Sequence, residues 1–174
     1  MKSATSHLAL ATLLACLPPS LLAHDPVTWN DARYEILLDG ETTDGRLSIF
    51  YSEVDEPTGP PLHVHDDAAE TFYVIEGTTR FVVNGNAIIV EEGGVAFVPQ
   101  GAEHTYRVLE ADGGRQLTIL TPAGFEHFFA RMAAEGLKIP EDMPRINEIA
   151  AEFKLRFTGP PLPPESPEPL ESPD

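Results

Sequence analysis

The sequence is poor in cysteine, in positive charge and in long hydrophobic runs. Cys16 is the only cysteine, so the chain can form no internal disulfide and no zinc-cysteine cluster, and the expected folded domain contains no cysteine nucleophile. Lysine and arginine total 11 against 28 aspartates and glutamates, and the formal net charge of -17 argues against nucleic acid or an anionic membrane surface as a partner. The apolar run at residues 8–15 is too short to span a bilayer.

Both ends of the chain are expected to lie outside the folded domain. Residues 1–23 have the organisation of a signal peptide, with Lys2 before the apolar run, and predict an exported, periplasmic or secreted protein. Two processing sites stay open: cleavage before His24, or a lipoprotein signal ending before Cys16, whose lipid would then attach the protein to a membrane. Residues 159–174 are mostly proline, glutamate and serine, which predicts a disordered acidic tail.

The middle of the chain consists of short β-type runs separated by turn residues. Asn84-Gly85 is the sharpest hairpin signal, because both residues tolerate the positive φ angles of a type I′ turn. No internal repeat is visible, so the pattern predicts one all-β sandwich or barrel. The expected strands are residues 33–38, 46–52, 71–75, 78–83, 87–90, 95–98, 104–109 and 116–120.

After Pro122 the hydrophobic period changes from that of a strand to that of a helix. Large apolar residues recur at three- and four-residue steps, at Phe125, Phe128, Phe129 and Met132. This stripe predicts a helix that ends near Gly136 and covers one face or edge of the sheet, with His127 exposed beside it. A second helix is expected at residues 144–152. One domain is therefore expected at residues 30–157, with its C-terminal helices starting near residue 124.

His63-Val64-His65 is the strongest local feature, because alternate side chains of a strand project from the same face. A lone His-x-His pair is more often a partly exposed polar pair than a pair of ligands. Glu70 follows after a short turn-like stretch, and His104 begins a later β run, so one barrel can bring all four together. Three imidazoles and one carboxylate suit one divalent ion of Fe, Mn, Ni, Cu or Zn. His63, His65, Glu70 and His104 are therefore the predicted metal ligands.

Two segments resemble the two motifs of the cupin superfamily. His-x-His, four residues, Glu70, six residues and Gly77 resemble the first motif, and Gly93, five residues, Pro-Gln-Gly, two residues and His104 resemble the second. The fifteen intervening residues match the shortest spacing usual for small bacterial members. Val108 stands where the second motif often has asparagine, which is usually structural. The resemblance implies a cupin jelly-roll β-barrel with a short C-terminal helical segment.

Within that superfamily the sequence segments at residues 61–65, 70–77 and 121–126 are similar to those of small quercetin-dioxygenase-like cupins. The resemblance implies a metal-dependent dioxygenase of a flavonol-like or other enol or aromatic substrate, with Glu70 as the catalytic proton acceptor. Spacing alone leaves Glu70 equally open as a fourth metal ligand. Strand parity places Phe72 and Val74 on the face of Glu70, and Tyr106 on that of His104, so these three are candidates for a substrate pocket.

Two other functions stay open because the fold does not determine the activity. A non-catalytic exported protein that binds a small ligand or the metal would have the same barrel and ligands. A metal-dependent isomerase or lyase would need more polar groups than the inward positions offer. The expected partner is a small-molecule substrate, with no nucleic acid and no membrane unless Cys16 is lipidated, and a homodimer is plausible because jelly-roll sheets have edges.

Overall fold

The computed structural model describes residues 25–164 of the 174-residue chain. The predicted signal peptide with Cys16 and most of the predicted acidic tail lie outside these residues. Among the helices that the structure describes, none is long and apolar enough to cross a membrane.

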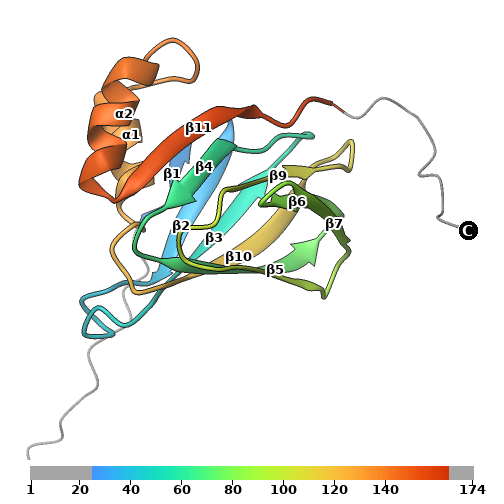
Figure 1. Cartoon of the computed structure of the whole chain (residues 1–174), viewed down its shortest axis with the longest axis horizontal. Helices are drawn as coiled ribbons and strands as arrows, with labels where there is room; N and C mark the ends of the chain where they lie inside the picture. The colour runs from blue at the N-terminus through green and yellow to red at the C-terminus, as the bar shows by residue number, and fades with distance from the viewer. Residues whose placement is uncertain (1–24, 165–174) are drawn as a thin grey trace, which may run out of the picture.

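The described chain folds into two antiparallel sheets that face each other, with two short helices at one end (Figure 1). The six-stranded sheet contains, in spatial order, β1 (Val27–Trp29), β2 (Ala32–Leu38), β3 (Ser48–Val54), β10 (Gly114–Thr121), β5 (Ala69–Glu76) and β8 (Val95–Val98). The five-stranded sheet contains β11 (Leu155–Pro161), β4 (Pro61–His65), β9 (His104–Val108), β6 (Thr79–Val83) and β7 (Asn86–Val90). The predicted all-β jelly roll is confirmed, and each of the eight expected strands is present.

Alternation along the strands fills the space between the sheets. Buried and partly exposed residues alternate along β3 and β10, so that one side of the six-stranded sheet faces the core. One core cluster, around Phe72 and Phe81, lies between the sheets. The predicted hairpin turn joins β6 and β7, where Asn84 and Gly85 have φ angles of 48° and 78°.

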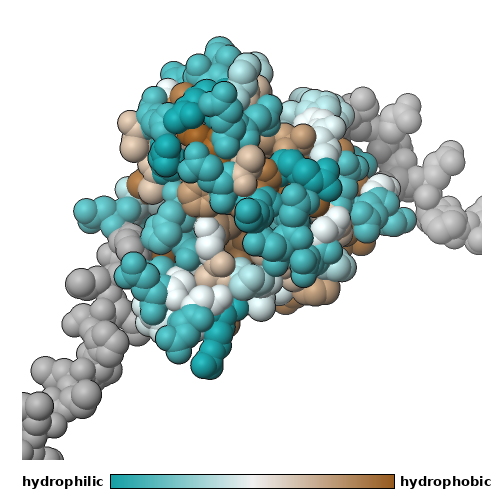
Figure 2. All heavy atoms as spheres, turned by 60° about the vertical axis from the view of Figure 1, so that its left-hand side comes forward, coloured by the Kyte–Doolittle hydropathy of each residue, from teal (hydrophilic) through white to brown (hydrophobic). Residues whose placement is uncertain are grey.

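The two helices form a second core cluster with the barrel. Helix α1 (Phe128–Glu135) ends at Gly136, whose left-handed φ of 65° stops the helix at the predicted position, and α2 spans Met143–Glu152. Helix α1 contacts β1, and α2 contacts β11. Met132 of α1 and Ile146 of α2 are fully buried. The face of the molecule in Figure 2 is mostly hydrophilic, with smaller patches of hydrophobic residues between the hydrophilic groups.

The last strand corrects the expected start of the tail. We expected the tail to begin at Gly159, but β11 continues to Pro161 and pairs with β4. The sequence hides this strand because only Leu155 and Phe157 alternate inward before the proline-rich stretch begins. Proline is tolerated there because β11 is an edge strand, where a missing N–H breaks no ladder bond on the open side.

Candidate metal centre

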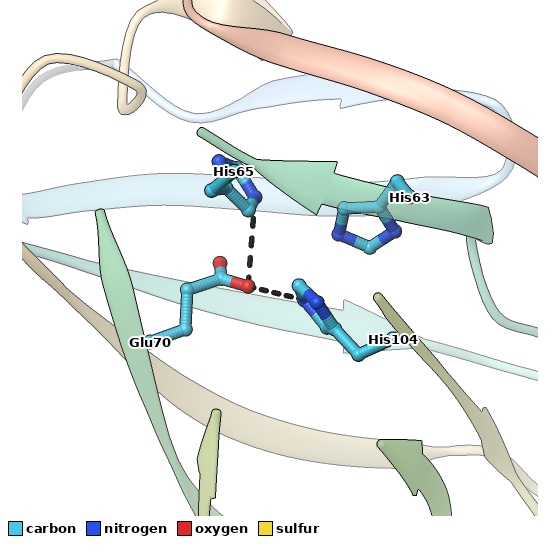
Figure 3. Close-up of side chains that lie close together, drawn as sticks. All are labelled: His63, His65, Glu70 and His104. Carbon is cyan, nitrogen blue, oxygen red and sulfur yellow. Dashed lines mark hydrogen bonds and ion pairs between the residues drawn. The ribbon is translucent and has the colours of Figure 1, made fainter. Parts of the chain in front are cut away.

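The four predicted ligands meet inside the barrel, and all four come from strands (Figure 3). His63 and His65 lie two residues apart on β4, and His104 is the first residue of β9, directly opposite His63 in the ladder. Glu70, near the start of β5, reaches toward them from the other sheet. The cluster therefore bridges the two sheets, and all four side chains are buried.

The donor atoms are close enough to surround one ion. One ligand atom from each residue lies within 4.8 Å of all the others. The Glu70 carboxylate oxygen Oε2 is 2.6 Å from His104 Nε2 and 3.5 Å from His65 Nε2. Two donors on opposite sides of a metal are about 4.2 Å apart when each bond is ~2.1 Å. Adjacent donors are ~3.0 Å apart, so a small rearrangement, with Glu70 and His104 moving slightly apart and the widest pairs moving closer, is enough to complete a coordination shell.

Backbone carbonyls aim two of the imidazoles at the centre. His63 Nδ1 lies 2.8 Å from the carbonyl oxygen of Pro61, and His104 Nδ1 lies 3.0 Å from that of Ala102. A ring that donates Nδ1–H to a carbonyl presents Nε2 to a ligand. The Gly101 N–H also donates to the His65 carbonyl at 2.9 Å, which ties the turn before His104 to the ligand strand.

The protonation states also suit a metal. Burial, together with the neighbouring imidazoles, lowers the pKa of His63 to about 3, and burial lowers the pKa of His65. Burial alone would raise the pKa of Glu70, but the imidazoles of His65 and His104 outweigh it and lower that pKa to about 2. Burial opposes the charged form of His104, but its hydrogen bond to Glu70 wins and raises the His104 pKa. Two neutral imidazoles and one carboxylate therefore stand ready at neutral pH.

The donor set also discriminates among possible occupants. His65 Nε2 is buried and has no hydrogen-bond partner among the described residues, a costly arrangement that a metal bond would relieve. Three nitrogen donors and one oxygen donor, with no thiolate, favour a transition metal over calcium or magnesium. The residues present therefore fit a divalent transition metal.

Metal removal should destabilise the protein, because an ion that binds only the folded chain stabilises it by mass action. At a free-metal concentration about a hundredfold above Kd, the stabilisation is ~2.7 kcal/mol. For a domain of this size we expect Tm to fall by roughly 5–10 °C after treatment with a chelator, and to recover when zinc is added. Differential scanning calorimetry measures both changes. Equal Tm values with and without chelator would contradict a bound metal.

A cavity with aromatic walls opens beside the cluster. His63, His65 and Glu70 form part of its wall. Phe125 presents its ring edge-on to His65, with centroids 4.6 Å apart. The other aromatic residues on the wall include Tyr34, Phe72, Tyr106, Phe128, Phe129 and Phe157. The arrangement is that of a small-molecule site, with apolar walls and a few convergent polar groups.

Two of the three predicted pocket residues line this cavity. Phe72 and Tyr106 are on its wall, but Val74 is not: it is buried one step deeper on the inward face of β5, in the core cluster with Phe72 and Phe81. The alternation of side chains along a strand predicted the correct face of the sheet for Val74, but it does not predict how far along the barrel axis a residue lies from the cavity.

Sequence reasoning missed the part of the wall that comes from the chain ends. The phenylalanine stripe was expected only to cover the sheet, yet Phe125, Phe128 and Phe129 also line the cavity. Phe157 was missed because β11 was not recognised, and Tyr34 faces the cavity from β2. His127, at the start of α1, is exposed as expected.

The fold and the cluster together define the class of protein: a jelly-roll β-barrel whose three buried histidines and one glutamate form a candidate metal centre. A family model described as "Cupin domain" matches residues 50–120, which include all four cluster residues. The match supports a cupin domain over residues 50–120, as the motifs indicated. Its histidines and glutamate form a group that can bind a metal ion.

Similar proteins fall within the same fold. Over 73 residues, 42% of this chain, the sequence is 27% identical to quercetin 2,3-dioxygenase of Bacillus subtilis (strain 168), and the match spans 22% of that relative's length. The structure of KdgF from Halomonas sp. is similar with a TM-score of 0.51 and 18% identity, over 57% of this chain and 86% of that one. The nucleoside dehydratase Pac13 is similar with a TM-score of 0.52 and 12% identity, over 80% and 88% of the two chains. At these identities the structures establish the fold alone.

Proposed function

We propose that this cupin domain is a metal-dependent dioxygenase that acts on a planar small molecule with a hydroxyl group next to a carbonyl, such as a flavonol. One observation carries the proposal: the ionised carboxylate of Glu70 is buried beside three histidines and forms part of the wall of an aromatic cavity. A carboxylate in that place can hold a metal or accept a proton from a bound substrate.

The cavity walls suit an aromatic substrate. Phe72 and Phe125 flank the cluster, with Phe72 6.4 Å from the His104 ring and Phe125 4.6 Å from the His65 ring, centroid to centroid. Flat apolar surfaces on two sides bind a planar ring and exclude water from the reacting atoms. Apart from the cluster, most residues on the cavity wall are apolar, which disfavours a sugar substrate.

Glu70 has two roles in this proposal, and both follow from its surroundings. A bound metal would make the substrate hydroxyl more acidic and give its electrons a path to O₂. Glu70 would then take the hydroxyl proton on a carboxylate oxygen, because the bond of His104 Nε2 to Glu70 at 2.6 Å gives way when that nitrogen binds the metal. A Glu70 that stayed on the metal would instead leave this proton to solvent.

The sequence similarity also supports a dioxygenase activity. The relative of similar sequence bears the name quercetin 2,3-dioxygenase, and the aligned stretch is 27% identical. The aligned stretch spans 22% of that relative's length. Quercetin is therefore proposed as a substrate of this chain and is not inferred from the similarity alone.

Oxygen dependence tests the proposal directly. We expect metal-loaded protein to consume quercetin under air and to leave it intact under nitrogen, as followed by the visible absorbance of the flavonol. Loss of quercetin in both atmospheres would indicate an isomerase or lyase and contradict a dioxygenase. Binding without loss, across a panel of enols and flavonols, would indicate a non-catalytic binding protein.

A further inference from the structure

A second group of buried polar side chains lies inside the barrel, away from the metal cluster. Ser52 on β3 and Gln116 on β10 are direct partners in the six-stranded sheet, and each is only 4% exposed. Both side chains act on the hydroxyl group of Tyr106, which belongs to β9 in the opposite sheet, and oppose the rise in its pKa that burial causes. The phenol therefore faces two buried polar side chains of the opposite sheet.

Packing alone does not account for this group. The Gln116 oxygen Oε1 is buried and has no hydrogen-bond partner among the described residues, which leaves the Nε2 group of the amide to act as a donor toward the Tyr106 oxygen. An unpaired buried acceptor is costly, whereas apolar side chains at these three positions would carry no such cost. With the amide donating to the phenol oxygen and the Ser52 hydroxyl able to do the same, the phenol hydrogen is left for a ligand.

Tyr106 and the metal cluster belong to the same cavity. Tyr106 lines the cavity together with His63 and Glu70. Between them lies Phe72, whose ring centroid is 6.4 Å from that of His104 and 5.6 Å from that of Tyr106. A planar ring that packs against Phe72 would therefore lie near both the cluster and the phenol. Burial, assisted by the charge of Glu70, raises the pKa of Tyr106, so the phenol keeps its proton at any physiological pH.

We propose that Tyr106, oriented by Ser52 and Gln116, binds an oxygen atom at the end of the substrate that points away from the metal cluster. The inference rests on the proposed function, and it narrows the substrate class. The substrate is a planar ring with a hydroxyl next to a carbonyl at one end and a further hydroxyl or oxo group at the other. Tyr106 is the binding residue, and Ser52 and Gln116 are positioning residues.

Two pyranones test this proposal as a matched pair. Kojic acid and allomaltol share the same ring and the same hydroxyl next to a carbonyl, and at the opposite end kojic acid has a hydroxymethyl group where allomaltol has methyl. Zinc-loaded protein is the appropriate form, because zinc has no redox chemistry and the experiment then measures binding alone. The absorbance shift of each pyranone on chelation gives its Kd.

We expect the wild-type protein to bind kojic acid about tenfold more tightly than allomaltol, the usual effect of one buried hydrogen bond. In Tyr106→Phe this ratio should fall to about one through weaker kojic acid binding, with allomaltol changed less than about twofold. Ser52→Ala keeps the phenol but loosens it, and should lower the ratio by a smaller factor. A general loss of packing would instead weaken both pyranones equally.

Tyr73→Phe is the matched control, because Tyr73 is 41% exposed on the outer side of β5 and its variant should keep the wild-type ratio. If Tyr106→Phe failed to fold, the Ser52→Ala ratio would decide. A wild-type ratio near one, or a full tenfold ratio in the variants at Tyr106 and Ser52, would overturn the proposal. If zinc-loaded wild type bound neither pyranone, chelation at the metal would be wrong, and the proposed function would fall with it.

Discussion

Replacement of both His63 and His65 by alanine is expected to lower the metal content from about one ion per chain to nearly none. The two residues supply two of the three nitrogen donors, and they lie on the same face of β4. Each has a low pKa, so in the wild-type protein little or no proton competes with the metal for its ring nitrogen at neutral pH. Only Glu70 and His104 would remain, and their hydrogen bond at 2.6 Å competes with metal binding.

Elemental analysis of protein purified without a metal-affinity step measures this effect. His127→Ala is the control, because His127 is exposed at the start of α1 and lies outside the cluster, and its metal content should equal that of the wild type. Circular dichroism should be recorded for every variant, because His63 and His65 are buried and their removal leaves space in the barrel. Equal metal in the wild type and the folded double variant would mean that the cluster is not the metal site.

The sequence predicted the cluster well because the rules involved are local. Strand parity alone places His63 and His65 on one face, and the structure keeps them on β4 as a pair. His104 was placed by the Pro-Gln-Gly turn before it, and the Gly101 N–H indeed bonds to the backbone of the ligand strand. Local strand and turn geometry of this kind depends little on the rest of the fold.

The cavity was harder to predict because its walls come from distant parts of the chain. Tyr34, Phe125 and Phe157 meet there from β2, the segment before α1, and β11. Periodicity shows that a residue faces inward, but it does not show which inward residues lie next to an open space. The same limit explains why Val74 was assigned to the pocket and why the network of Ser52, Gln116 and Tyr106 was not foreseen.

Glu70→Gln should reduce oxygen-dependent consumption of quercetin by about two to four orders of magnitude if Glu70 takes the substrate proton. Glutamine keeps the size and hydrogen-bonding shape of the side chain, but its amide is not basic. Glu91→Gln is the control, because Glu91 is exposed in the turn after β7, and its rate should match the wild type. A Glu70→Gln variant that retained metal and more than about a tenth of the wild-type rate would rule out Glu70 as the proton acceptor.

The metal content of the same variant separates the two roles of Glu70. The amide oxygen of glutamine is a neutral and weaker ligand than a carboxylate, so a permanent fourth ligand should cost metal affinity when it is replaced. If Glu70 acts as a base and is not a metal ligand, its replacement by glutamine should lower the turnover rate with little change in metal content, because three histidines still hold the ion. Loss of turnover at full metal loading, with unchanged quercetin binding, would therefore assign the proton transfer to Glu70. Parallel loss of metal and turnover would make Glu70 a ligand, with solvent as the proton acceptor.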